Sequence, residues 1–247
     1  MLKITELANK ITKNSALFAG NCGVSFKVQA AGMRYYAPPV VQDTSEWPEK
    51  RKLIMVDKQP NYGNSRPLRM KKMLNLIRGP EEVHTDLLYK GYGVKALLGG
   101  RMKYQHFEAI RRIFFRRIDP DRMFAIWRVE PPWQPCAKRG VGKRMGGGKG
   151  SIHHYVTPVR AERIIVEIGG DIHKLEAKKM LAAAAEILPF PARFVSQESL
   201  EKEREENRLL EENNINPYTM EYVIRNNMGG CGNWLSPYDY KWFGKYK

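Results

Sequence analysis

The sequence has few of the residues that build disulfide-bonded or metal-binding proteins. It contains three cysteines in 247 residues, Cys22, Cys136 and Cys231, and no two of them form a C-x-x-C pair. This spacing argues against a disulfide framework and against a thiolate zinc site. Among the five histidines, His153 and His154 are adjacent, so on a strand they would point to opposite faces. We therefore expect no metal site and no cofactor.

Long apolar runs and catalytic motifs are missing as well. No stretch of about 18 apolar residues is present, so we expect no membrane-spanning segment. No G-x-S-x-G motif occurs, and carboxylates are scarce near the histidine pair. Cys136 with a distant histidine is the minimum for thiol catalysis, but buried, inert thiols are the simpler interpretation of Cys136 and Cys231. We expect no catalytic residues.

Acidic residues are strongly outnumbered. Lys and Arg number 42 against 26 Asp and Glu, which gives a formal net charge of +16 and a pI near 9.8. A charge of this size concentrates polyanions around the protein, and nucleic acid is the default partner. An anionic membrane surface is the rival, but binding to it normally requires a lipid anchor or a basic amphipathic helix.

The N-terminal third divides by composition into two successive segments, residues 1–36 and 37–85. The first 42 residues contain five basic residues, one acid and frequent Ser, Thr and Asn, which is typical of a mitochondrial presequence. We place this presequence at residues 1–36; a basic RNA-binding arm is the alternative. Residues 37–85 contain six prolines and no helical or strand period. They indicate an extended basic arm that needs another surface to order it and is unfolded in the isolated protein.

Residues 86–196 have the patterns of a globular α+β domain. Branched and aromatic residues predict strands at 124–129 and 163–168 and, more weakly, at 152–159. Helices are predicted over 104–118 and 174–188, with a last strand over 192–195.

The first of these helices carries charge on one side. Its apolar stripe comprises Phe107, Ile110, Phe114 and Ile118. Arg112 and Arg116 lie opposite this stripe as a pair of like charges, which an anionic partner would stabilise. A solvated helix face is the alternative interpretation.

The chain after residue 196 changes character. Residues 197–212 contain seven glutamates and three basic residues, which predicts a helix that faces solvent or a protein neighbour. The tail, 216–247, is aromatic and glycine-rich, with too little aliphatic content for a core of its own. We expect residues 197–247 to be an extension that packs on a partner.

The most informative segment is basic and rich in glycine. No acid occurs from residue 131 to 161, and residues 138–150 combine five cations with glycines. Glycine permits close backbone approach and the cations supply phosphate contacts, so the segment predicts an anion-binding loop. A flexible exposed loop is the alternative.

This loop does not have the spacing of an NTP-binding P-loop. With Lys149 as the motif lysine, the first glycine would fall at Lys143, and Gly150 stands where Ser or Thr is required. We also expect no strand directly before it.

Several segments carry a family resemblance. Arg-Met-Gly-Gly-Gly-Lys-Gly at 144–150, followed by a strand and by Val-Glu-Ile-Gly-Gly at 166–170, resembles the L-sixteen (L16) family of large-subunit ribosomal proteins. Further similarity extends over roughly residues 68–196. The segments that carry it are 93–96, 107–112, 126–128, 182–189 and 194–195, while 123–129 and 235–239 resemble the mitochondrial branch.

The resemblance implies a hammerhead-type α+β fold, with an extended N-terminal arm and a C-terminal extension, seated on large-subunit rRNA. It also implies that the loop around Arg144 points toward the peptidyl-transferase region and the A-site tRNA. Two departures stand out. Gly147 lies where bacterial members have lysine, and His154 and Tyr155 replace an aromatic Tyr-Trp pair.

We therefore expect a non-enzymatic structural protein of the mitochondrial large ribosomal subunit, located in the mitochondrial matrix. Its expected partners are rRNA, A-site tRNA and neighbouring mitochondrial ribosomal proteins, with no membrane anchor. A mitochondrial RNA-processing or RNA-modifying factor is the alternative. The expected rRNA-binding residues are Arg69, Lys71, Lys72, Arg101, Arg112, Arg116, Lys138, Arg139 and Lys143. The expected tRNA-facing loop comprises Arg144, Met145, Gly146, Gly148 and Lys149.

Overall fold

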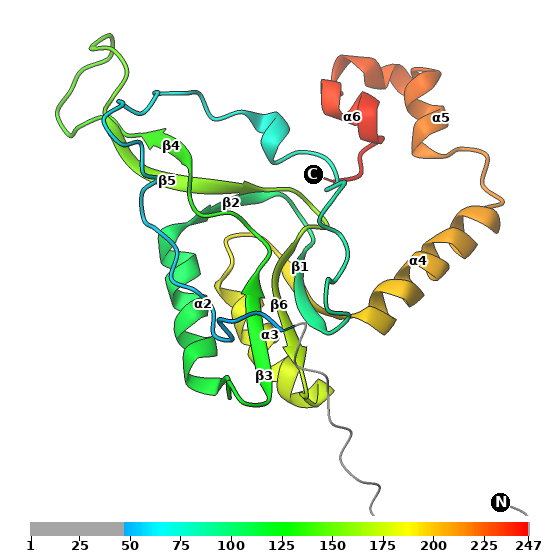
Figure 1. Ribbon diagram of the computed structural model, residues 1–247. Helices are drawn as coiled ribbons and strands as arrows, with labels where there is room; N and C mark the ends of the chain where they lie inside the picture. Colours follow the sequence, from blue (N-terminus) through cyan, green and yellow to red (C-terminus); the bar gives the residue numbers. More distant parts are fainter. Residues whose placement is uncertain (1–46, 247) are drawn as a thin grey trace, which may run out of the picture. The chain divides into compact units, whose positions relative to one another are not determined.

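The computed structural model describes residues 47–246 (Figure 1). The expected presequence, residues 1–36, and the start of the expected arm, residues 37–46, lie outside this range. The described chain combines helices with two antiparallel sheets, which confirms the α+β class.

The two sheets differ in size. The larger has the strand order β3-β6-β1-β7 and the smaller the order β2-β5-β4, with every neighbouring pair antiparallel. The strands expected at 124–129, 152–159, 163–168 and 192–195 are confirmed as β3, β5, β6 and β7, whereas β1, β2 and β4 were missed. In chain order the strands are β1 (Tyr92–Ala96), β2 (Gly100–Lys103), β3 (Met123–Trp127), β4 (Gln134–Ala137), β5 (Ile152–Val159), β6 (Ile164–Gly170) and β7 (Ala192–Ser196).

Two predicted helices cover the larger sheet. Helix α2 (Tyr104–Arg117) contacts α3 (Lys174–Ile187), which packs against β1 and β7. The apolar stripe of α2 is buried as its period predicts, and Phe114 is completely removed from solvent. The helix ends at Arg117, and its C-cap, Ile118, is already extended before Pro120. These side chains form the main core together with those of β1, β3 and β6.

The opposite face of this sheet carries a buried carboxylate. Glu167 lies between Val166 and Ile168 of the main core, so its side chain points the other way. It is fully buried and accepts hydrogen bonds from the backbone N–H groups of Leu88 (3.1 Å) and Tyr89 (2.7 Å). The carboxylate thereby fixes this loop over the sheet. Burial raises the pKa of Glu167 above its ordinary value, although these two donors and the charge of Arg128, whose Nε lies 3.6 Å from Glu167 Oε2, oppose the shift.

The described part of the arm, residues 47–85, lies against the domain. It contains no α-helix or strand, as expected, and forms a single 3-10 turn, η2 (Leu74–Leu76). Leu53 is buried in the main core, and the Trp127 Nε1–H group donates to the carbonyl of Ile54 at 2.9 Å. The surface that orders this part is therefore the chain's own domain. The expectation that it is unfolded in the isolated protein does not fit these contacts.

The C-terminal extension begins with the predicted helix, α4 (Gln197–Glu212), which buries Leu200. It continues through α5 (Met220–Arg225), the 3-10 segment η3 (Met228–Asn233) and α6 (Pro237–Trp242). Helix α6 packs on the arm, because the Trp242 ring fills the space beside Gly79 and Arg78 stacks over Tyr238. Between residues 47 and 246, no helix combines the length and apolar character needed to cross a membrane.

Replacing Glu167 by Gln should change how stability depends on pH. Because burial raises the folded-state pKa, the folded protein holds this proton more tightly than the unfolded chain does. The wild type therefore loses stability as pH rises from 4.5 toward the folded pKa. Glu167→Gln lacks the titrating group, so its free energy of unfolding should fall less over this window. Urea denaturation of both proteins across the window measures the difference, with the exposed Glu82→Gln as control. If the free energies of unfolding of the wild type and of Glu167→Gln changed in parallel with pH, the prediction would be contradicted.

Candidate nucleic-acid interface

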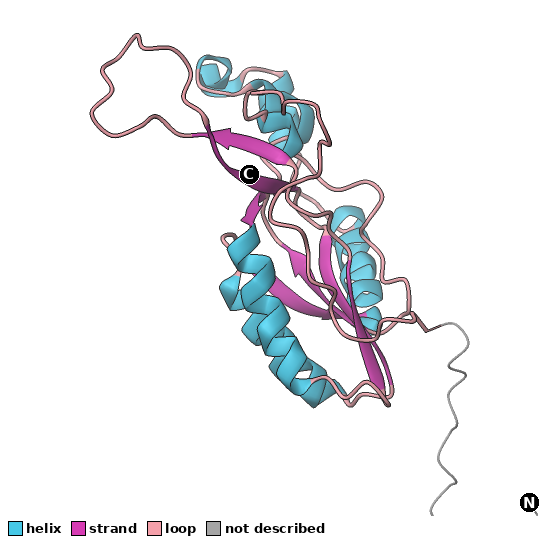
Figure 2. Ribbon diagram, turned by 60° about the vertical axis from the view of Figure 1, so that its left-hand side comes forward, coloured by secondary structure: helices cyan, strands magenta, loops and turns pink. Residues whose placement is uncertain are grey.

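The basic glycine-rich loop connects β4 to β5 and projects beyond their ends (Figures 1 and 2). Its neck is closed where the backbone N–H group of Lys138 donates to the carbonyl of Ser151 at 3.1 Å. Every residue from 137 to 149 is exposed. The expectation that no strand precedes the loop is wrong, because β4 ends at Ala137. A P-loop remains excluded, since its glycine spacing is missing and a strand rather than a helix follows.

The cations of the loop are free of carboxylates. Lys138, Arg139, Lys143 and Arg144 are all exposed, and none of them forms an ion pair within residues 47–246. The side chain of Arg139 instead contacts the sulfur of Met145, whose side chain is 88% exposed. Such a loop presents positive charge and polarisable surface without an internal counterion.

Two glycine positions show what the backbone requires. Gly146 has φ +89°, a left-handed conformation that other residues adopt at a cost, although open space surrounds it. Gly150, at the neck, is required for a different reason. A Cβ atom there would collide with the carbonyl oxygen of Lys138, the residue whose N–H group closes the neck.

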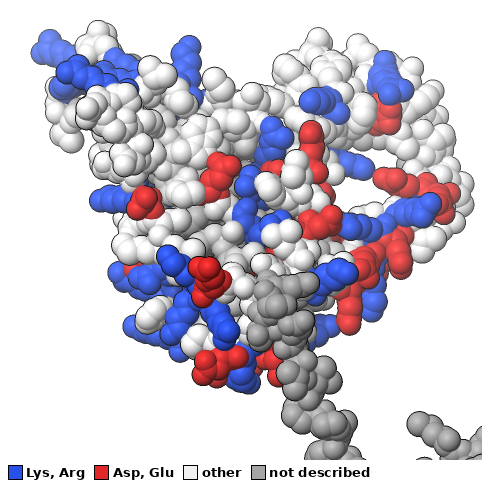
Figure 3. Space-filling view, viewed as in Figure 1, with Lys and Arg blue, Asp and Glu red and all other residues white. Residues whose placement is uncertain are grey.

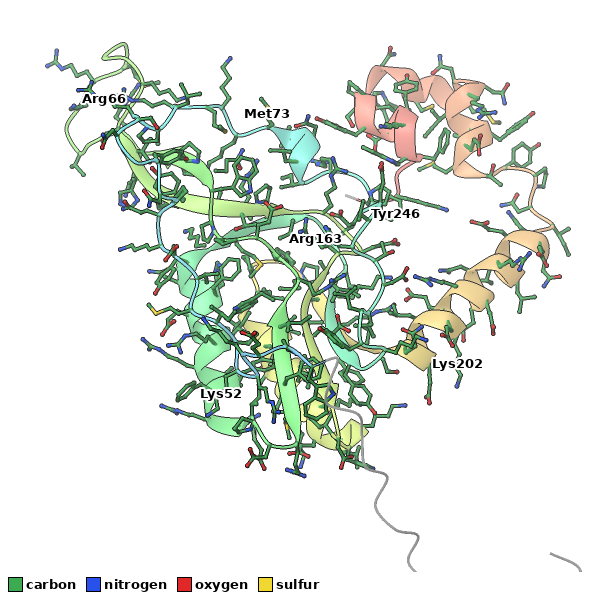
Figure 4. The ribbon with its side chains drawn as sticks, viewed as in Figure 1. Lys52, Arg66, Met73, Arg163, Lys202 and Tyr246 are labelled. Atoms are coloured by element: carbon green, nitrogen blue, oxygen red, sulfur yellow. The ribbon has the colours of Figure 1, made fainter. Side chains whose placement is uncertain are left out.

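The arm runs beside this loop. Arg69 Nη1 donates to the carbonyl of Lys149 at 3.3 Å, and Lys149 Nζ donates to the carbonyls of Arg69 and Met70. In β2, Arg101 Nη2 donates to the carbonyl of Met73 at 3.3 Å. The structure thus brings together expected site residues from the arm, β2 and the loop. Arg66 lies at the same end of the molecule (Figure 4).

The neck of the loop also gathers cations around a histidine. The pKa of His154 is lowered first by burial and then by the nearby charges of Lys103, His153, Lys72 and Lys138. These lysines come from β2, the arm and the start of the loop. The space-filling view shows Lys and Arg gathered at this end of the molecule (Figure 3).

The histidine pair itself departs from expectation. The pairing of β4 with β5 shifts register between Cys136 and Ala137, which leaves His153 as the extra residue of a β-bulge. As a result the Nδ1 atoms of His153 and His154 lie 3.1 Å apart, and the expectation of opposite faces is wrong. In the described range, 47–246, no group of three or more His, Cys, Asp or Glu side chains could hold a metal ion.

Arg112 and Arg116 lie apart from this cluster, toward the far end of α2. Arg112 Nε donates to Glu108 Oε1 at 3.1 Å, although 71% of the Arg112 side chain remains exposed. Hydrogen bonding from Arg111, followed by that from Arg112, lowers the pKa of Glu108 to about 2. Arg116 is exposed and has no ion-pair partner in the described part of the chain. The two arginines are therefore not equivalent.

The sequence did not predict the residues that hold the arm against the domain. Arg160 Nη2 donates to the carbonyl of Asn75 at 3.3 Å, and the rings of Tyr62 and Tyr155 lie 6.3 Å apart. Pro80 forms an isolated bridge with Ala161. No local signal marks these contacts, because each joins segments distant in the sequence.

Part of the chain matches a known protein family. Residues 65–195 match the family model described as ribosomal protein L16p/L10e. The chain is also 32% identical, over 117 residues, to the protein named large ribosomal subunit protein uL16 of Neorickettsia sennetsu (strain ATCC VR-367 / Miyayama). That similarity covers 47% of this chain and 82% of the relative. The family match spans part of the arm, the loop and both sheets, and ends before α4.

Arg116→Ala should reduce the salt dependence of RNA binding more than Arg112→Ala. The charge of Arg112 is shared with Glu108, whereas Arg116 is available to a phosphate. A lost phosphate contact should lower the slope of log affinity against log salt by somewhat under one unit. The measurement is binding of each variant to a folded large-subunit rRNA fragment over a range of salt concentrations. Unchanged slopes in both variants would assign the pair to solvent.

Gly147→Lys should strengthen the binding of transfer RNA to assembled large subunits, because Gly147 lies in the part of the loop that is expected to face the transfer RNA. A Cβ atom at Gly147 would meet no heavy atom closer than the Arg144 carbonyl oxygen at 3.6 Å, and its φ is not left-handed. The added cation should gain roughly 0.5–1 kcal/mol and steepen the salt slope. Gly146→Lys is the matched control, because its left-handed φ adds strain of roughly 1–2 kcal/mol. Equal gains in both variants would show that the loop's backbone conformation does not matter for binding.

Proposed function

The chain belongs to the L16p/L10e family of ribosomal proteins, and from that premise we propose that it binds rRNA in the mitochondrial large ribosomal subunit and directs its loop to the A-site tRNA. Family membership itself establishes a structural rather than an enzymatic role, in the large subunit. The RNA contacts, the transfer RNA contact and the mitochondrial location are the proposed part.

The exposed, acid-free loop is the observation that carries this proposal. Residues 137–149 are all exposed, and the cations among them have no internal carboxylate partner in the described chain. Phosphate is the partner that this arrangement favours, because arginine and lysine then form charge-assisted hydrogen bonds without first breaking an ion pair. Arg144, Met145, Gly146 and Gly148 form the outer part of the loop, which we assign to the transfer RNA.

The arm and the inner part of the loop support rRNA binding. Arg69, Lys71 and Lys72 are exposed on the arm, next to the start of the loop with Lys138 and Arg139. A surface of this kind recognises folded RNA through phosphates and shape rather than through base edges. Arg101 contributes indirectly, since its guanidinium group binds the arm carbonyl of Met73.

Two features support the mitochondrial location. The basic, acid-poor composition of residues 1–42 is that of a presequence. The extension at 197–247 lies outside the matched residues 65–195 and offers a surface for protein neighbours. The alternative, an RNA-processing or RNA-modifying factor, has no support from the family, whose members are not enzymes.

Arg144→Glu should weaken A-site transfer RNA binding by roughly 1–3 kcal/mol, the scale of a lost hydrogen bond to a charged group. Assembly should suffer less, because the arm and α2 supply the other rRNA contacts. The experiment sediments tagged protein from a mitochondrial lysate, measures its incorporation into large subunits, and then measures transfer RNA binding by the purified subunits.

The matched control is Lys202→Glu, which makes the same kind of charge change on exposed α4, far from the loop (Figure 4). It should leave transfer RNA binding unchanged. Normal transfer RNA binding by assembled Arg144→Glu subunits would remove the loop as a functional contact. Failure of the wild-type protein to sediment with the mitochondrial large subunit would contradict the proposed location.

A further inference from the structure

Lys149 differs from the other cations of the loop in where its ammonium group points. Lys138, Lys143 and Arg144 have no hydrogen-bond partner for their side chains within residues 47–246, whereas Lys149 Nζ donates to two carbonyls of the arm, those of Arg69 and Met70. The distance to the Met70 oxygen is 3.1 Å. In return, Arg69 Nη1 donates to the Lys149 carbonyl at 3.3 Å. All the hydrogen bonds between arm and loop in the described chain involve Lys149.

We infer that Lys149 is a positioning residue, which clasps the arm to the loop so that their cations form one RNA-binding surface. The inference rests on the proposed function for its RNA partner. It assigns Lys149 a role different from that of Arg144. The ammonium group has three N–H donors, and two of them are directed to arm carbonyls, so only one is left for a phosphate.

The backbone around Lys149 holds it in this orientation. Gly148 precedes it with φ +77°, and Gly150 follows it in contact with the Lys138 carbonyl at the closed neck. Lys149 therefore emerges from the fixed end of the loop rather than from its tip.

The hydrogen bonds of Lys149 belong to a longer row of hydrogen bonds that holds the arm on the domain, and they lie at the end of that row nearest the loop. Farther along, Arg101 binds the carbonyl of Met73 and Arg160 binds that of Asn75. These two contacts fix the arm to the smaller sheet, but neither reaches the loop. Without the Lys149 ammonium group, only the hydrogen bond from Arg69 to the Lys149 carbonyl would join the arm to the loop, so Lys71 and Lys72 would keep their charge and be held less firmly relative to the loop. Binding that depends on both sets of cations would then lose the advantage of a preformed surface.

The first test uses the free full-length protein and needs no RNA. Lys149→Met keeps most of the side-chain length and removes the donors, and Lys143→Met removes an exposed cation from the same loop. Amide hydrogen exchange over residues 66–72 should become several-fold faster in Lys149→Met and stay unchanged in Lys143→Met. Equal exchange in the wild type and Lys149→Met would overturn the clasp.

The second test separates positioning from direct phosphate binding. Lys149→Met should weaken binding to a large-subunit rRNA fragment about fivefold, the loss expected for a net hydrogen bond of ordinary strength. In a background with Lys71→Ala and Lys72→Ala, the same change should have a smaller effect, because the clasp then positions fewer arm cations. Additive losses in this cycle would make Lys149 a direct RNA contact and overturn the inference. A wild-type protein that fails to bind the fragment would contradict the proposed function, while the exchange experiment would still decide whether the clasp exists.

Discussion

Donation from arginine and lysine side chains to backbone carbonyl oxygens holds the irregular segments of this chain in place. Arg51 binds the carbonyl of Pro120, Arg101 that of Met73 and Arg160 that of Asn75. A carbonyl satisfies such a donor without cancelling its charge, as a carboxylate would. A chain with 42 basic and 26 acidic residues can therefore order its arm and still present positive potential to a polyanion.

Carboxylates do take part in the fold, but at other places. Glu203 of α4 pairs with Lys95 and Arg193, and Arg204 pairs with Asp86. Acidic side chains accordingly gather around α4, while the end formed by the loop is basic (Figure 3). This segregation leaves one region suited to RNA and another suited to protein neighbours. It also explains how the acidic helix can coexist with the proposed nucleic-acid interface in one chain.

A helix or strand could be predicted from the sequence where its own residues carry the pattern of that element. The apolar period of α2 and the branched residues of β6 are visible without any knowledge of their partners. Strand β1 contains Gly93 and Lys95, and β4 contains Pro135, so neither has the composition of a strand. Both form because distant strands supply their hydrogen bonds. The loop could likewise be predicted from its composition, whereas the contacts of Lys149 with the arm, across 79 and 80 residues, could not.

The full exposure of residues 137–149 has a consequence for kinetics. Apart from Lys149, the side chains of these residues form no hydrogen bond outside the loop in the described chain, so fixing them against a ligand costs conformational entropy. This entropy cost weakens binding, and differences in affinity appear mainly in the dissociation rate, so a ligand held only by these residues should dissociate faster than one held by preordered groups. The arm differs, because its backbone is already bound to the domain before any RNA arrives. Under the proposed function, the preordered arm suits an rRNA that stays bound, and the loop suits a transfer RNA that is released in every cycle of translation.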